Sequence, residues 1–378
     1  MSFQKVPSIK ALELSLSMKD DNDDPSPVGM RMRAAYYLRY HYETINTKKQ
    51  LSSEDEEMKG NIIQILCNNL CNKDHGSLLR HEIGFVLGQL RDKRACNTLI
   101  DILDTTTDCV IARHECAEAL AAIGCKDSIS ILKKYSKVCI DIDNPIEISE
   151  TCMIALKYLQ WKLNNTNNND NKRKNVDDDD DDDEYIVACP CMEQTSIVPS
   201  SPYLSVDPAP PHVDPKYVTL SNEDLGQLLL STNTNLFDRY RVLFTLRNRA
   251  GDSDSGDQNT NTNDIKSAIQ ELNNVLLTDT SSALLRHELA YVLGQIQHPC
   301  SQDALITCLK NKNEHRMVRH EAAEALGAVM ENYYKTDDEN DRMLCLHILN
   351  EYKMDEELVV SESCIVALDA VDYWNTTS

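Results

Sequence analysis

The chain reads RHEIGFVLGQL at residues 80–90, and a close copy, RHELAYVLGQI, follows at 286–296. A second pair, RHECAEALAAIG at 113–124 and RHEAAEALGAVM at 319–330, opens with the same three residues. Arg-His-Glu therefore occurs four times, 33 residues apart within each half and 206 residues apart between the halves. Self-similarity at such a period is the signature of a repeat architecture.

Two flanking segments repeat as well. The segment MRMRAAYYLR at 30–39 resembles DRYRVLFTLR at 238–247. The segment ISETCMIALKYLQW at 148–161 resembles VSESCIVALDAVDYW at 360–374. Each half thus carries four related segments in the same order, and we infer that a four-repeat block was duplicated.

Each repeated segment is predicted to be helical. In residues 115–123 the small and apolar residues recur at i, i+3, i+4 and i+7, which is the spacing of one helix face. Shorter amphipathic segments, such as 94–104 and 304–310, lie between them. This gives two antiparallel helices per repeat. Such a pair cannot bury its own apolar face, so neighbouring pairs must stack.

The fold class that follows is all-α: a HEAT-like helical-repeat solenoid with two pseudo-symmetric lobes of four helix pairs each. Ankyrin and tetratricopeptide arrays have a similar period, but their sequence patterns are absent. We expect an N-terminal lobe at 1–163 and a C-terminal lobe at 219–378. The Asn/Asp-rich and Pro-rich residues 164–218 are predicted to be an interlobe linker, and the polar insertion 251–263 an exposed loop.

Composition narrows the classes of partner. The formal net charge is −23, which disfavours nucleic acid because the phosphates would be repelled. No signal peptide or long apolar run is visible, so we expect no membrane association. The fourteen cysteines are scattered and are expected to be reduced, in a cytoplasmic protein. Cys189-Pro190-Cys191 lacks zinc-site spacing. A monomer is expected.

The repeated His-Glu dyads are candidate metal ligands. Adjacent residues on a helix point about 100° apart, so one dyad cannot clamp an ion alone. No histidine follows four residues later, which excludes the HExxH arrangement. Ligands must therefore converge from different helices, as the same register of stacked repeats allows. Four imidazoles and four carboxylates suit two octahedral ions with open positions, as in non-haem iron or manganese sites.

A purely structural role is the competing interpretation. In helical repeats a pattern such as Arg-x-Glu-Ala-Ala-x-Ala-Leu commonly serves packing and ion pairing alone. Four copies of histidine at one register favour metal binding, because packing does not require histidine there. We expect structural roles for the neighbours: inter-repeat contacts for the four dyad arginines, surface or inter-repeat salt bridges for Glu118 and Glu324, core packing for Met317, and close helix approach for Gly88 and Gly294.

With YLSVDPAPP at 203–211, the four dyads and the pattern RHE…VLGQ / RHE(C/A)AEAL resemble the deoxyhypusine hydroxylase family. The resemblance covers nearly the whole chain apart from the polar insertions. It implies a non-haem di-iron monooxygenase with two Fe(II) ions per chain, O2 as co-substrate and an external reductant. Its implied protein substrate is translation factor 5A, whose deoxyhypusine side chain, a lysine extended by an aminobutyl group, becomes hypusine. The implied iron ligands are His81, Glu82, His114, Glu115, His287, Glu288, His320 and Glu321.

Two alternatives remain beside this hypothesis. One is a non-catalytic HEAT-repeat adaptor with structural histidines. The other is a bilin lyase-like repeat protein, since those chains share the Glu-Ala-Ala-x-Ala-Leu helix. Neither alternative requires histidine at all four equivalent positions. The resemblance also leaves open which glutamates bind iron and which face the substrate amines.

Overall fold

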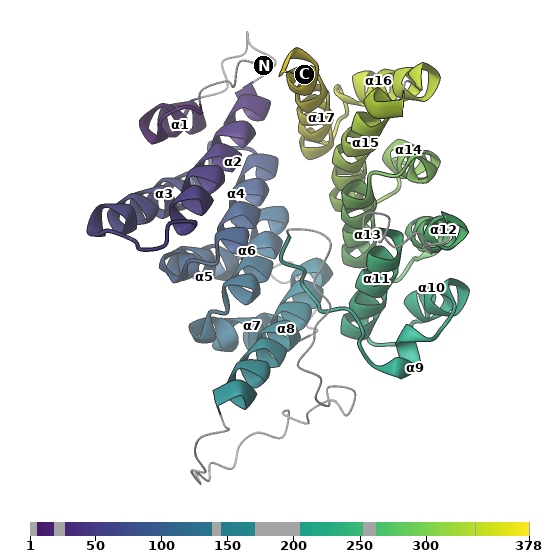
Figure 1. Ribbon diagram of the computed structural model, residues 1–378, viewed down its shortest axis with the longest axis horizontal. Coiled ribbons are helices and arrows are strands. Elements are labelled where there is room, and N and C mark those ends of the chain that lie inside the picture. Colours follow the sequence, from purple (N-terminus) through teal and green to yellow (C-terminus); the bar gives the residue numbers. More distant parts are fainter. Residues whose placement is uncertain are drawn as a thin grey trace.

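The computed structural model describes residues 6–18, 27–137, 145–170, 205–251, 262–336 and 338–377, and every regular element in these ranges is a helix. Figure 1 shows two facing columns, with α1 to α8 in purple to teal and α10 to α17 in green to yellow. The short helix α9 (Pro215–Val218) precedes the second column. The expected repeat solenoid of two lobes, each with four helix pairs, is confirmed.

Each pair consists of one outer and one inner helix (Figure 1). The outer helices are α1 (Ile9–Leu16), α3 (Ser53–Cys71), α5 (Cys96–Asp104), α7 (Ile129–Tyr135), α10 (Asn222–Leu230), α12 (Thr262–Thr278), α14 (Gln302–Lys310) and α16 (Glu339–Tyr352). The inner helices are α2 (Pro27–Asn46), α4 (Ser77–Leu90), α6 (Val110–Ile123), α8 (Ile146–Asp170), α11 (Leu236–Gly251), α13 (Ala283–Ile296), α15 (Arg316–Thr336) and α17 (Leu358–Thr377).

Buried arginines join the inner helices α4, α6, α11 and α15 to the end of the outer helix before each. Arg80 Nε donates to the carbonyl oxygen of Leu70 at 2.8 Å, and its guanidinium pairs with Asp108. The same hydrogen bond, from Nε to the carbonyl oxygen of the residue ten positions earlier, recurs at Arg113, Arg239 and Arg319. Since these bonds satisfy carbonyls that a helix end leaves free, they fix the pair geometry. The structural role predicted for the dyad arginines is confirmed.

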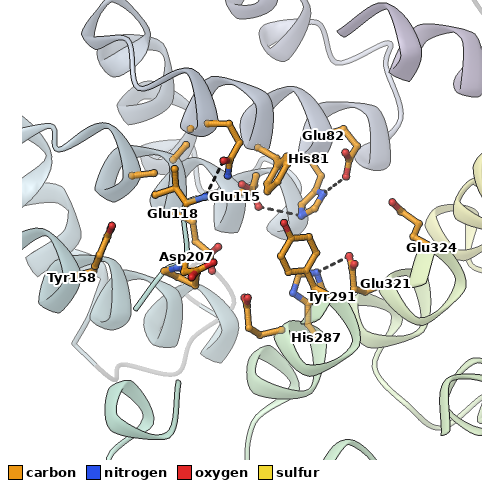
Figure 2. A pocket seen from close by; sticks show the side chains of 18 of the residues that line it. His81, Glu82, Glu115, Glu118, Tyr158, Asp207, His287, Tyr291, Glu321 and Glu324 are labelled. Carbon is orange, nitrogen blue, oxygen red and sulfur yellow. Dashed lines mark hydrogen bonds and ion pairs between the residues drawn. The ribbon is translucent and has the colours of Figure 1, made fainter. Parts of the chain in front are cut away.

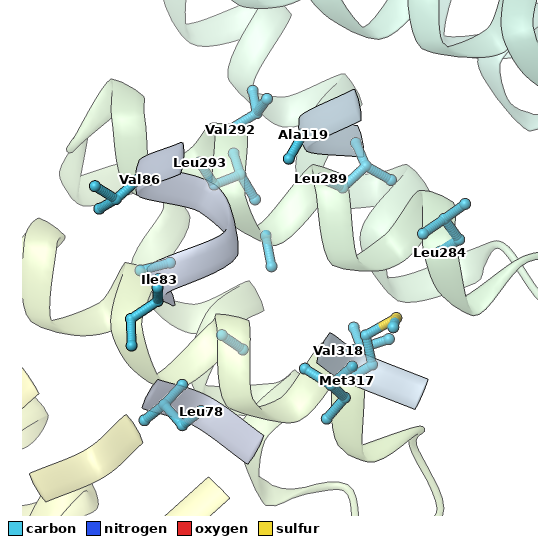
Figure 3. Packing of buried hydrophobic residues seen from close by; sticks show 14 of the residues in the cluster. Leu78, Ile83, Val86, Ala119, Leu284, Leu289, Val292, Leu293, Met317 and Val318 are labelled. Atoms are coloured by element: carbon cyan, nitrogen blue, oxygen red, sulfur yellow. The ribbon is translucent and has the colours of Figure 1, made fainter. Parts of the chain in front are cut away.

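Neighbouring inner helices approach closely at two glycines. A Cβ atom on Gly88 would lie 3.0 Å from Cα of Ala119, and one on Gly294 would lie 3.0 Å from Cα of Ala325. The close-approach role predicted for both glycines is confirmed. Figure 3 shows the apolar side chains that pack between these helices, among them Met317, which is fully buried as predicted.

The last helix of each lobe packs on the other lobe. Helix α8 contacts α11 and α13, and α17 contacts α2 and α4. At the first contact Ser282 Oγ donates to Glu150 Oε2 at 2.7 Å. At the second, Gly76 lies against the Glu362 carboxylate. A Cβ atom on Gly76 would be 2.7 Å from Oε1 of Glu362. The inner helices of both lobes therefore surround one shared centre.

The connection between the lobes is partly ordered. Helix α8 continues to Asp170, past residue 163, and residues 205–212 run extended against the second lobe. The acidic run at 177–183 and Cys189 to Cys191 lie outside the described residues, as do residues 252–261 of the polar insertion. The boundaries of the lobes stay a prediction. In the described part of the chain, none of the helices has the length and apolar character needed to cross a membrane.

Candidate metal centre

All four dyads lie on inner helices, about one turn after the helix start. The helices begin three residues before each arginine, at Ser77, Val110, Ala283 and Arg316. Residues before the tripeptide supply this first turn; at α13, for example, Ser282 Oγ accepts from Leu285 N at 3.0 Å. The dyads consequently occupy the second turn, where side chains face neighbouring helices rather than solvent.

The four histidine rings converge between the lobes. The His81 ring lies with its centroid 5.9 Å from that of His114, 5.9 Å from that of His287 and 5.5 Å from that of His320. His287 is also 5.3 Å from His114 and 5.4 Å from His320. All four residues are at most 5% exposed. Repeat register alone thus brings together side chains from four helices.

The donor atoms in this cluster fit a metal. Both ring nitrogens of His287 and of His320, and Nε2 of His81 and of His114, are buried without a hydrogen-bond partner. Buried polar atoms in native proteins are nearly always satisfied, so a set of imidazole nitrogens left together points to a bound cation. Metal coordination would satisfy them.

Carboxylates complete the set. Glu115 Oε2 lies 3.2 Å from His81 Nε2, and Glu321 Oε2 lies at the equivalent place, 3.5 Å from His287 Nε2. Two groups have ligand atoms within 4.8 Å of one another: His81 with His287 and His320, and His81 with His114 and Glu115. The first group draws on both lobes. Mixed imidazole and carboxylate ligation is typical of non-haem iron and manganese.

The protonation of the rings suits ligation. Burial, together with the neighbouring histidines, holds the pKa of His114 and of His320 well below the usual range. Both are therefore neutral, which is the form that binds metals. Burial also lowers the pKa of His81, but the Glu115 and Glu82 carboxylates outweigh it and raise that pKa well above its usual value. His81 thus lies where a positive charge is most favoured.

A cavity of about 100 Å³ opens onto the cluster (Figure 2). Glu118 and Glu324 line it and point to opposite ends, each one helical turn beyond a dyad histidine. The expectation of surface or inter-repeat salt bridges for these two residues was wrong. A residue four positions after a histidine shares its helix face, and that face is turned toward the cavity. The spacing alone could have placed them there.

Residues 205–212, here called the strap, cover one end of the cavity. Val206 N donates to Gln89 Oε1 at 2.9 Å, and Gln295 Nε2 donates to Ser205 Oγ at 2.8 Å. Asp207 lines the cavity and accepts two hydrogen bonds of 2.6 Å from the buried Arg247. Residues 205–212 were predicted as part of the linker, but their place over the cavity was not, although the glutamine after each close-packing glycine recurs in both halves. The strap therefore joins the two lobes beside the histidine cluster.

Comparisons with known proteins agree with this geometry. A family model described as HEAT repeats matches residues 269–342, and one described as PBS lyase HEAT-like repeat matches residues 112–137. A relative named deoxyhypusine hydroxylase from Drosophila melanogaster is 39% identical over 303 residues, covering 80% of this chain and 79% of its own. One of the same name from Danio rerio is 37% identical over 305 residues, covering 80% and 79%.

A solved structure is similar over nearly the full length. Human deoxyhypusine hydroxylase in complex with glycerol superposes with a TM-score of 0.66 at 31% sequence identity. The match covers 97% of this chain and 96% of the human one. The duplicated repeat and the arrangement of its helices are thus shared with a protein of known structure.

Proposed function

The chain belongs to the deoxyhypusine hydroxylase family and is an enzyme, and we propose that it uses a pair of Fe(II) ions, O2 and an external reductant to hydroxylate deoxyhypusine on translation factor 5A. The observation that carries this proposal is the convergence of four buried histidines with unpartnered nitrogens from both lobes. Neither an adaptor nor a bilin lyase-like repeat protein requires such a cluster, and the lyase-type match covers one repeat only.

The eight dyad residues form the proposed centre. The four imidazoles, Glu115 and Glu321 are assigned to the metals, because each of these two carboxylates lies against the Nε2 atom of a dyad histidine on the neighbouring inner helix. Glu82 and Glu288 lie at its edge, on the wall of the cavity. When bound, the iron pair would supply activation of O2 for oxidation of an unactivated C–H bond.

The protein's own residues bind and orient the substrate. The deoxyhypusine side chain carries two amines and is cationic at neutral pH, so acidic cavity walls attract it. Glu82, Glu118, Glu288 and Glu324 line the cavity. Phe85 and Tyr291, with ring centroids 6.0 Å apart, face each other from opposite lobes and supply an apolar wall for the methylene chain. Burial of the cluster excludes water from the reaction.

The same proposal includes a cytoplasmic monomer. The cysteines in the described ranges are all free, which fits a reducing compartment. Each lobe completes the other within one chain, so a second copy is not needed to assemble the cluster.

The test is reconstitution of the purified chain. Protein loaded anaerobically with Fe(II) is given deoxyhypusine-containing translation factor 5A, a reductant and air, and the substrate is followed by mass spectrometry. We expect about two irons per chain, as two octahedral sites imply, and the gain of one oxygen atom on the modified lysine. Hydroxylation at full rate by the metal-free protein contradicts the proposal.

A further inference from the structure

Four carboxylates of the cavity form two pairs, each with one member from each lobe. Glu82 and Glu324 lie at one end and Glu118 lies at the other (Figure 2), where Glu288 is its neighbour. Burial raises the pKa of Glu324, and the nearby Glu82 carboxylate raises it further. In the same way burial and then Glu118 raise the pKa of Glu288. The internal duplication makes the two pairs equivalent: Glu82 corresponds to Glu288, and Glu118 to Glu324.

Their hydrogen bonding is not equivalent. Tyr36 Oη donates to Glu82 Oε2 at 2.6 Å, and Ser363 Oγ donates to Glu324 Oε1 at 2.8 Å. Each carboxylate of this pair has therefore committed one oxygen to a hydroxyl group. In the other pair, Oε1 of Glu118 and Oε1 of Glu288 are buried without a hydrogen-bond partner. Glu288 as a whole is only 4% exposed.

The sequence accounts for this asymmetry. By the internal repeat, Tyr36 corresponds to Phe244, which has no hydroxyl, and Ser363 corresponds to Thr151. Thr151 does have a hydroxyl, but it donates to the carbonyl oxygen of Glu147 at 2.7 Å. The pair of Glu118 and Glu288 therefore lacks both of the hydroxyl donors that bond to Glu82 and Glu324. Unpartnered buried acceptors are costly, so a ligand with several N–H groups would be bound most strongly there.

The two ends also differ in access. Tyr36 is the exposed member of the cavity wall, at 39%, while the other lining residues are buried or half-buried. The opposite end is covered by Val206, Asp207 and Pro208 of the strap. Asp207 does not compete for a cation, because the buried Arg247 already neutralises it. The cavity therefore has a mouth at Tyr36 and a closed end at Glu118 and Glu288.

We propose that the substrate side chain enters past Tyr36 and places its terminal ammonium between Glu118 and Glu288, while Tyr36 holds Glu82 so that the mouth does not compete for that group. The inference rests on the proposed function and adds a direction to it. A primary ammonium has three N–H donors and matches the end with free acceptors. The protonated secondary amine has two N–H donors. It matches Glu82 and Glu324 near the mouth, each of which already accepts a hydrogen bond from a hydroxyl group. Tyr36 is thus a positioning residue.

The matched variants Glu118→Gln and Glu324→Gln test the direction. Both change a residue four positions after a dyad histidine, and neither is assigned to the metals. Binding of 1-butylamine, a primary amine without the second charge, is measured by calorimetry on the Fe(II)-loaded protein without oxygen. We expect Glu118→Gln to weaken binding about tenfold or more, the effect of removing a charged acceptor, and Glu324→Gln to change it by less than about threefold.

Tyr36→Phe tests the positioning role. Phenylalanine occupies the equivalent position 244, so the variant removes only the hydroxyl. It releases Glu82 Oε2, and we expect a second binding step for 1-butylamine at the mouth. Tyr40→Phe removes an exposed hydroxyl one turn further along α2 and should bind as the unchanged protein does.

Equal losses in the two glutamine variants, no loss in either, the reverse order, or a Tyr36→Phe protein that binds like the unchanged chain would each overturn the inference. Because this readout needs no oxygen, it is separate from the test of function. Hydroxylation with symmetric amine binding rejects only the direction of entry. Asymmetric amine binding without hydroxylation rejects only the proposed reaction.

Discussion

The rings of His114 and His287 lie 5.3 Å apart, centroid to centroid, although they belong to different lobes. Their separation depends on the contacts of α8 and α17, which hold the lobes together on both sides of the cluster. Each dyad is held by its own inner helix, and that helix is fixed by the arginine of the tripeptide and by close packing on its neighbour. The predictions below address these layers in turn.

Removing one ring should release metal without unfolding the chain. We expect His320→Ala to lower iron affinity at least about 100-fold, since changes even to groups that only orient a ligand cost 10–100-fold. Activity should fall with the metal, while the helical circular dichroism stays unchanged. Iron is measured by elemental analysis. His347→Ala, an exposed histidine of α16, is the control and should retain both metals. A full iron complement in His320→Ala would place the centre elsewhere.

Filling a close helix contact should destabilise the second lobe. A Cβ at residue 294 would lie 3.0 Å from both Cα and Cβ of Ala325, so we expect Gly294→Ala to lower the free energy of unfolding by about 1–3 kcal/mol. Gly60→Ala is the matched control, because the Cβ meets only the end of the exposed Arg94 side chain, at 3.1 Å, and no backbone atom. There we expect a gain of about 0.5–1 kcal/mol from helix propensity. Urea unfolding measures both, and a neutral Gly294→Ala would show that the contact relaxes.

The contact between α8 and α13 should respond to pH. Burial, with Glu147 nearby, raises the pKa of Glu150 from 4.5 to about 7. The folded state thus retains a proton that the unfolded state loses, so this contribution to stability is complete below pH 4.5 and is lost as pH rises to about 7. Glu150→Gln retains an acceptor for Ser282 but carries no charge. We expect it to raise the free energy of unfolding by about 1–2 kcal/mol above pH 7. Urea unfolding at several pH values measures this.

A loss of stability in Glu150→Gln above neutral pH would contradict this account, as would an unchanged pH dependence.

Detaching the strap should lower the free energy of unfolding. Arg247 is fully buried, and Asp207→Asn removes the carboxylate charge that pairs with its guanidinium, for which we expect a loss of about 3–5 kcal/mol. The strap should then become a site of rapid proteolysis. Ser205→Ala removes the hydrogen bond from Gln295 and the one that Ser205 donates to Asp207, but it leaves the ion pair intact and should cost about 1 kcal/mol. Similar losses in the two variants would mean that the ion pair does not anchor the strap.

The sequence was sufficient for what the repeat determines. Helix pairing, the inward register of His81 and its three equivalents, and the close approach at Gly88 follow from local periodicity and duplication. Features that differ between the halves were not predicted. Tyr36 and Phe244 are aligned, but Tyr36 is exposed at the mouth of the cavity and Phe244 is fully buried. A proline-rich segment gives no local signal of the residues it will contact, so its role was visible only in three dimensions.

The ring of helices has one further consequence. Each lobe supplies two of the four imidazoles, so an ion held there acts as a crosslink between two bodies that also meet through α8, α17 and the strap. By linkage, whatever favours occupancy also favours the joined form. If the bound ion is iron, as proposed, a chain without it would be both inactive and more easily opened, and a shortage of the metal would shorten the lifetime of the protein.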